Sequence, residues 1–287
     1  SPLDNGRWFR HALVAQSTGL RAGLIVMDQP PPITETPPPA TEVSAMSLAA
    51  RLLNMFAIPG DVFDEVKVTR HAAANWLVPA LIASVVGAAS AFLMFSQPAI
   101  QQQLREQQER VMEQQVKAGK MTRAQAEQAQ TIADKFSSPT VLKILGAFGA
   151  VGGSFARVFW WALILWLLSR WFLHVRISYL KAAEVAGLAG MISILGAIVS
   201  LLLIVNLGKL FSTPSLALAV GDFDAKNKSH LLLGAVNVFN FWFIGVMASG
   251  LARLAGVPFV RAAFLMLGYW IAWSLILIFT GLGTLAM

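Results

Sequence analysis

The sequence contains no cysteine and few charged side chains. The absence of cysteine excludes disulfides, thiol chemistry and cysteine-bound metals. The chain also lacks an HExxH motif, a P-loop and a nucleophile elbow, which mark common metal, nucleotide and hydrolase sites. Its four histidines lie at spacings without the pattern of a metal site: His11, His71, His174 and His230. The sequence therefore predicts no cofactor, no metal and no enzymatic activity.

Charged residues make up 13% of the chain, and hydrophobic residues make up 56%. Because a soluble domain carries about 25% charged residues, this composition predicts a polytopic integral membrane protein. The net charge is +7, but the basic residues are dispersed around apolar runs and do not cluster on one face. That distribution argues against nucleic acid as a partner and favours membrane lipids with anionic headgroups.

Five apolar runs are long enough to cross a bilayer, which takes about 20 apolar residues in a helix. We expect the crossings at 75–95, 146–168, 182–207, 231–251 and 262–280. The Gln-rich segment 98–138 is polar, and Thr122 and Gln125 have the spacing of a capping box, which predicts a helical hairpin. The predicted fold is all-α, with a polytopic integral membrane helical bundle of five transmembrane helices over 71–287 and an extramembrane helical hairpin.

The segment 1–46 contains two triple-proline runs. Repeated prolines favour polyproline II, so we expect a disordered Pro-rich tail. The segment 1–26 has no signal-peptide layout, and two interpretations of it stay open. Either it lies upstream of a natural start at Met27, or it is a genuine tail without fixed structure.

The segment 47–70 precedes the first crossing and is predicted to form two amphipathic helices. Proline fixes φ and lacks an N–H donor, so it begins the second helix. Asp64 and Glu65 fall on the polar face of that helix. The pair of helices either lies in the headgroup plane or packs on the bundle as caps, and these two interpretations are compatible. The residues predicted for a membrane-surface or partner-binding face are Leu48, Leu52, Leu53, Phe56, Pro59, Val62 and Phe63.

Small and polar residues stand out inside the apolar runs. Small residues at helical spacing predict close helix packing at Ala83, Gly87, Ala91, Gly146, Gly149 and Gly190. The intramembrane polar candidates are Arg157, Asn206, Asn237 and Asn240. An arginine at the bilayer centre should snorkel, pair or face a wet groove; alternatively, the second crossing is shifted and Arg157 lies near an interface. Buried asparagines more often hold helices together by hydrogen bonds than form a transport site.

The motifs LLNMFAIPGDVFDEV and WLVPA around the start of the first crossing, with five crossings in all, resemble the Yip family of five-span membrane proteins. These are the Ypt/Rab-interacting proteins and their bacterial relatives. The resemblance covers 47–287, and Pro59, Val62 and Phe63 lie in its most specific part. It implies a cytosolic N-terminal region and, in eukaryotic members, binding of Rab-type GTPases in vesicle trafficking. The Gln-rich hairpin looks more like bacterial relatives, which implies a bacterial cytoplasmic membrane. The family supplies no catalytic residues.

These observations favour a non-enzymatic membrane scaffold or adaptor that binds a membrane or cytosolic protein and associates with further copies of itself. The alternative is a small-solute or lipid transporter or channel, motivated by Arg157 and the asparagines of the fourth crossing. Basic residues in the short connectors predict a cytoplasmic N-terminus and a C-terminus on the far side. They are Arg170, Arg176, Lys181, Arg253 and Arg261.

Overall fold

The computed structural model describes residues 46–221 and 223–286. The predicted disordered tail, 1–46, lies outside the described residues except for Met46. The two interpretations of 1–26 concern residues that are not described. Within the described residues the regular structure is helical, apart from one isolated β-bridge between Ser215 and Asn237. The predicted all-α fold is therefore confirmed.

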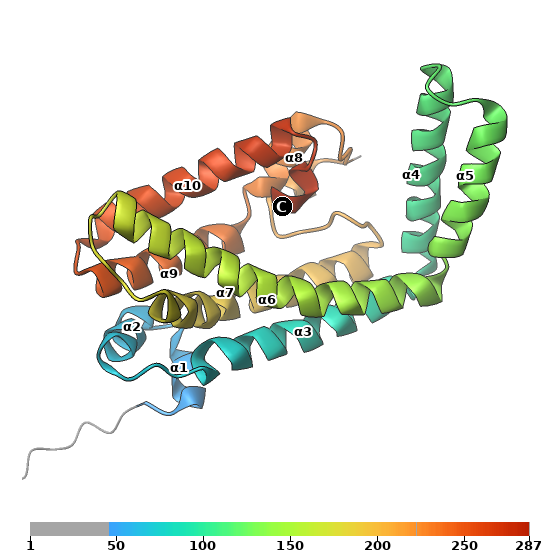
Figure 1. Ribbon diagram of the computed structural model, residues 1–287. Coiled ribbons are helices and arrows are strands. Elements are labelled where there is room, and N and C mark those ends of the chain that lie inside the picture. Colours follow the sequence, from blue (N-terminus) through green and yellow to red (C-terminus); the bar gives the residue numbers. More distant parts are fainter. Residues whose placement is uncertain (1–45, 222, 287) are drawn as a thin grey trace, which may run out of the picture. The chain divides into compact units, whose positions relative to one another are not determined.

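The helices follow one another along the chain as labelled in Figure 1. They are α1 (Leu48–Asn54), α2 (Pro59–Val68), α3 (Ala74–Met94), α4 (Pro98–Lys117), α5 (Arg123–Phe136), α6 (Pro139–Trp171), α7 (Tyr179–Leu207), α8 (Lys228–Ala235), α9 (Val238–Ala255) and α10 (Phe259–Phe279), with short 3-10 turns at Leu216–Ala219 and Gly283–Ala286. Of the helices in the described part of the chain, five are long and apolar enough to cross a membrane: α3, α6, α7, α9 and α10.

The fourth crossing begins later than predicted. The apolar run 231–251 is interrupted, because α8 ends at Ala235 and α9 starts at Val238. The side chain of Asn237 accepts a hydrogen bond from the backbone N–H of Phe239 at 2.9 Å, which caps the new helix. Asparagine favours such N-caps because its short side chain satisfies a free N–H group of the first turn. Hydropathy cannot reveal a break of this kind.

Three of the spanning helices, α3, α6 and α7, pack against one another, while α9 packs on α7 and α10 packs on α9 (Figure 1). Small residues permit the close crossings. A Cβ atom on Gly87 would lie 2.7 Å from the Cβ of Ala150, and one on Gly146 would lie 2.7 Å from the Cβ of Ala91. A Cβ atom on Gly187 would meet the backbone of Trp76. The α3–α6 and α3–α7 contacts therefore depend on these glycines.

The Gln-rich segment forms the helices α4 and α5. The capping box of α5 is present, since Thr122 Oγ1 accepts from the Gln125 N–H at 3.2 Å and Gln125 Oε1 accepts from the Thr122 N–H at 2.9 Å. Gln103 of α4 donates to the carbonyl of Gly208 at 2.5 Å and accepts from the Leu210 N–H at 3.1 Å. The hairpin is thus bonded to the loop that follows α7.

Candidate functional site

Glu184 is the centre of a buried polar network in the first turns of α7. Its carboxylate accepts from Asn75 Nδ2 at 2.6 Å and from Lys181 Nζ at 3.0 Å, and it lies 3.3 Å from His71 Nδ1. The side chain is 1% exposed. Burying a carboxylate is unfavourable unless it is paired and hydrogen-bonded, and these three partners satisfy that condition.

Arg51 extends the network to the surface helices. Its guanidinium pairs with Glu65 Oε1 at 2.9 Å and donates to Asn75 Oδ1 at 3.2 Å. Asn75 therefore accepts from Arg51 and donates to Glu184. One continuous set of polar contacts joins α1, α2, α3 and α7. We call Arg51, Glu65, His71, Asn75, Lys181 and Glu184 the polar anchor.

The apolar face of α2 is packed beside the polar anchor. Val62, Phe63 and Val66 are fully buried, and α2 contacts both α7 and α9. Asp64 also pairs with Arg253 of α9 at 2.8 Å. The two surface helices thus pack on the bundle as caps.

The residues predicted for the surface face divide into two groups. Val62 and Phe63 are covered by the chain itself, so in this structure they cannot meet a partner. Leu53 is 70% exposed, whereas Leu48, Leu52, Phe56 and Pro59 are partly covered. Pro59 is the first residue of α2, where its fixed φ suits the helix start.

Two further apolar side chains of this region are exposed, which sequence analysis did not single out. Val68 at the end of α2 is 80% exposed, and Ile58 before α2 is 44% exposed. Glu65 departs from its predicted place on a wet helix face, because its side chain is only 15% exposed and pairs with Arg51. The pairing partner lies in the preceding helix, so the periodicity of α2 alone could not indicate it.

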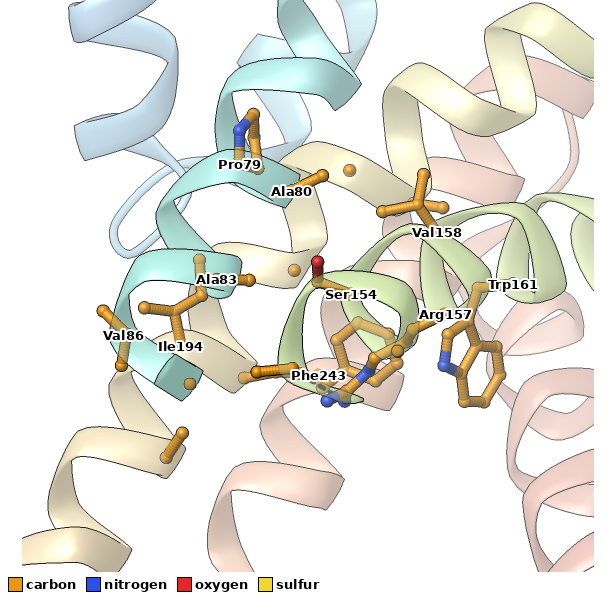
Figure 2. A pocket seen from close by; sticks show the side chains of 18 of the residues that line it. Pro79, Ala80, Ala83, Val86, Ser154, Arg157, Val158, Trp161, Ile194 and Phe243 are labelled. Atoms are coloured by element: carbon orange, nitrogen blue, oxygen red, sulfur yellow. Dashed lines mark hydrogen bonds between the residues drawn. The ribbon is translucent and has the colours of Figure 1, made fainter. Parts of the chain in front are cut away.

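A cavity of about 270 Å³ lies farther along the bundle, between α3, α6 and α7. Figure 2 shows the side chains of α3, α6 and α7 around it, with Phe243 of α9 and the guanidinium of Arg157 at one side. Most of the wall is apolar, and many of the lining residues are glycine or alanine. Ala83, Gly87, Gly149 and Gly190 are among them.

Gly149 and Gly190 line this cavity and do not form close helix contacts. A Cβ atom on either residue would have no heavy atom within 4 Å. Within this chain neither glycine lies at a close helix crossing, whereas Gly87, Ala91 and Gly146 do. Small side chains allow close packing where two helices touch and leave space where they diverge.

Arg157 of α6 lies near the middle of the membrane-spanning helices. Its Nη2 donates to Ser193 Oγ at 2.6 Å, and its guanidinium lies 5.3 Å from the ring centroid of Phe243. Ser193 is the middle residue of α7, so it lies roughly 21 Å from either end of that helix at about 1.5 Å rise per residue. Arg157 thus lies in the middle part of the helices, with a hydroxyl partner and at the wall of the cavity.

The charge of Arg157 has no acidic partner within 4.0 Å among the described residues. A hydroxyl and an aromatic face only partly replace the hydration of a guanidinium. On insertion scales an arginine at this depth costs about 2.5–3.5 kcal/mol. This cation thus differs from those of the polar anchor.

The structure does not bring the three asparagines to Arg157. Asn206 donates to the Leu202 carbonyl of its own helix at 2.7 Å. Asn237 caps α9, and Asn240 donates to the Ala235 carbonyl at the end of α8 at 3.4 Å. None of them is part of the described cavity wall. They stabilise helix ends and turns, and their bonds are local rather than between distant spans.

Comparison with protein families gives one match. The model of the Yip1 domain matches residues 53–282, which include all five spanning helices, most of the polar anchor and the whole cavity wall. The chain belongs to the Yip1 family. The resemblance found in the sequence is thereby confirmed, as is its consequence of an integral membrane protein. Neither the curated proteins nor the solved structures include a match to this chain.

Sequence reasoning missed most of the polar anchor of this Yip1-family protein. One signal was available: Lys181 and Glu184 are three residues apart in an otherwise apolar helix, which places them on the same side. Among residues 46–221 and 223–286, no three or more His, Cys, Asp or Glu side chains lie together in a way that could hold a metal ion. The described geometry therefore offers two features with functional potential, the anchored surface helices and the cavity at Arg157.

Proposed function

We propose that this Yip1-family protein is a non-enzymatic membrane adaptor. In this proposal α1 and α2 form a fixed platform for a cytosolic protein, and the N-terminal side of the bundle faces the cytoplasm of a bacterium. The polar anchor is the observation that supports the proposal. A helix that only floated among lipid headgroups would need no buried hydrogen bond from Arg51 to Asn75 of α3, which in turn donates to Glu184 of α7.

A fixed platform favours binding because less conformational entropy is lost when a partner arrives. The anchored segment still exposes apolar side chains, Leu53 and Val68, with the basic side chain of Lys67 beside the second. Large apolar residues that a fold leaves uncovered are typical of surfaces that meet a protein or a membrane. We therefore assign partner binding to this outer face, and not to the buried Val62 and Phe63.

Self-association belongs to the same proposal, but the small-residue faces do not support it. Gly87 and Gly146 are used inside the bundle, in the contact of α3 with α6. The hairpin is a better surface for a second copy, because Ile132 is 58% and Phe136 is 62% exposed on α5.

The partner surface can be tested with a photo-crosslinking residue at Leu53 or Val68. The matched control is Phe148, which is 74% exposed on the spanning helix α6. We expect positions 53 and 68 to crosslink to one protein that position 148 does not reach. The double change Leu53→Asp and Val68→Asp should remove a partner that co-purifies with the unaltered chain, while the bundle stays folded. Crosslinking to lipid alone at all three positions would contradict the proposal.

The orientation can be tested directly because the chain has no native cysteine. Single cysteines at Val68 and at Gly119, in the turn of the hairpin, are labelled with a membrane-impermeant maleimide. We expect Val68→Cys to react only from the cytoplasmic side and Gly119→Cys only from the other side. Reaction of both from one side would contradict the odd number of crossings between them.

A further inference from the structure

We propose that the cavity at Arg157 binds a single-chain anionic amphiphile, with the acid group on Arg157 and the hydrocarbon chain along the apolar wall. A long-chain carboxylic acid is the simplest member of this class. The inference concerns the middle of the bundle and is independent of the adaptor function proposed for α1 and α2.

The charge of the site calls for an anion. A guanidinium carries five N–H donors, and one bond, from Nη2 to Ser193 Oγ, is present at Arg157. No carboxylate of the described chain lies within 4.0 Å of it. In surroundings of low dielectric constant an acid group is the complement that gains most, because a planar guanidinium binds a carboxylate through two parallel hydrogen bonds.

The rest of the cavity suits a hydrocarbon chain. Ala83, Val86 and Ile194 contribute apolar surface, and Gly149 and Gly190 leave room where larger residues would fill it (Figure 2). The cavity measures about 270 Å³, close to the lower end of small-molecule sites at roughly 300–1,000 Å³. One chain segment fits this space better than the two chains of a phospholipid.

The depth of Arg157 also favours a simple acid. Ser193, its hydrogen-bond partner, is the middle residue of α7. A phospholipid keeps its phosphate at the headgroup level, about 15 Å from the centre of a 30 Å hydrocarbon core. A carboxylic acid can travel to the centre in its neutral form and ionise there by giving its proton to water, because the opposite charge of the guanidinium favours the ionised form.

Binding can be measured with the purified full-length chain in detergent, using displacement of a fluorescent fatty acid. The probe ligands are hexadecanoic acid, hexadecanol as the uncharged analogue of equal chain length, and a diacyl phosphatidylglycerol. We expect saturable binding of the acid that is at least tenfold tighter than binding of the other two. Equal binding of acid and alcohol would remove the role assigned to Arg157, and tighter binding of phosphatidylglycerol would overturn the single-chain assignment.

Two changes probe the two halves of the site. Arg157→Leu removes the cation, and Gly190→Leu fills the space while leaving the cation in place. The matched control is Gly245→Leu on α9, since Gly245 also has open space around it but is not part of the cavity wall. We expect each of the first two changes to weaken acid binding at least tenfold and the control to leave it within twofold. Melting temperatures of all three variants verify folding. Unaltered acid binding by Arg157→Leu, or equal losses in all three folded variants, would overturn the proposal.

Discussion

The polar anchor and the Arg157 cavity hold charged groups in opposite states. In the polar anchor Glu184 has three partners, and Arg51 has a carboxylate and an amide. At the cavity Arg157 has a hydroxyl and an aromatic ring. Charges with complementary partners hold the helices in one arrangement. A cation with no acid beside it in the described part of the chain can still bind an acid from outside the chain. This difference distinguishes the polar anchor, which is a structural network, from the Arg157 cavity, which is a candidate ligand site in the same bundle.

Two glycines of α7, Gly187 and Gly190, also differ in their surroundings. Gly187 and Gly190 lie three residues apart, yet a Cβ atom on Gly187 would meet the backbone of Trp76 and one on Gly190 would meet nothing within 4 Å. The first glycine lies at a crossing with α3, and the second lies where the helices leave a cavity. The same residue type therefore serves contact at one position and space at the other.

The largest effect is expected when a charge of the polar anchor loses its partner. Glu184→Ala leaves Asn75 Nδ2 without its acceptor and leaves the buried Lys181 with the carbonyl of Arg70 but no acid, and breaking a buried ion pair in this way costs about 3–5 kcal/mol. The melting temperature in detergent should fall sharply. The control is Glu113→Ala, whose exposed pair with Lys117 on α4 contributes about 0.5 kcal/mol or less. Equal melting temperatures for the two variants would show that the anchor does not hold the helices.

The next effect concerns Gly187 and Gly190 of α7. Gly187→Ala forces a Cβ atom against the backbone of Trp76, and overpacking of this kind costs about 1–3 kcal/mol. Gly190→Ala meets no neighbour and should be neutral or stabilise the helix by about 0.5–1 kcal/mol, since alanine restricts the unfolded chain. Thermal unfolding of both variants measures the difference. Equal stability of the pair would contradict the helix crossing at Gly187.

Removal of Arg157, a cation without an acidic partner among the described residues, should act in the opposite direction from Glu184→Ala. Arg157→Met relieves the insertion cost of about 2.5–3.5 kcal/mol and gives up a hydrogen bond and a cation–π contact of roughly 1 kcal/mol each. We expect a net gain of about 1 kcal/mol in a ligand-free preparation, seen as a higher melting temperature. A loss of stability comparable to that of Glu184→Ala would place Arg157 among the structural charges.

Local patterns in the sequence predict much of this fold. The length of the apolar runs predicts the spanning helices, and the apolar spacing in 47–70 predicts the two amphipathic helices α1 and α2. The capping box at Thr122 and Gln125 is likewise a local signal. Each of these features depends on residues within one or two helical turns of one another, so the order of side chains is sufficient to reveal it.

The two sites depend on contacts that are far apart in the chain. Asn75 and Glu184 are 109 residues apart, and the wall at Arg157 combines three helices and a ring from a fourth. Helical periodicity gives the face of a residue but not the neighbour of that face. Periodicity therefore predicts close packing for Gly149 and Gly190 and a wet surface for Glu65. Asn237 gives a local signal of the helix break, since asparagine is a favoured N-cap. The hydropathy of 231–251 favours one continuous helix instead.

The smallest effect distinguishes the two ion pairs of α2. Glu65 pairs with Arg51 almost out of contact with solvent, whereas Asp64 and Arg253 are each 49% exposed. Arg253→Ala should therefore lower stability by about 0–1 kcal/mol, and salt should reduce the difference because it screens exposed charges. Arg51→Ala should be several times more harmful and nearly insensitive to salt, since Glu65 would remain buried without a cation. Melting temperatures at low and high salt compare the variants. A large, salt-insensitive loss of stability for Arg253→Ala would contradict this difference. It would mean that the Asp64–Arg253 pair, and not the polar anchor alone, holds α2 on the bundle.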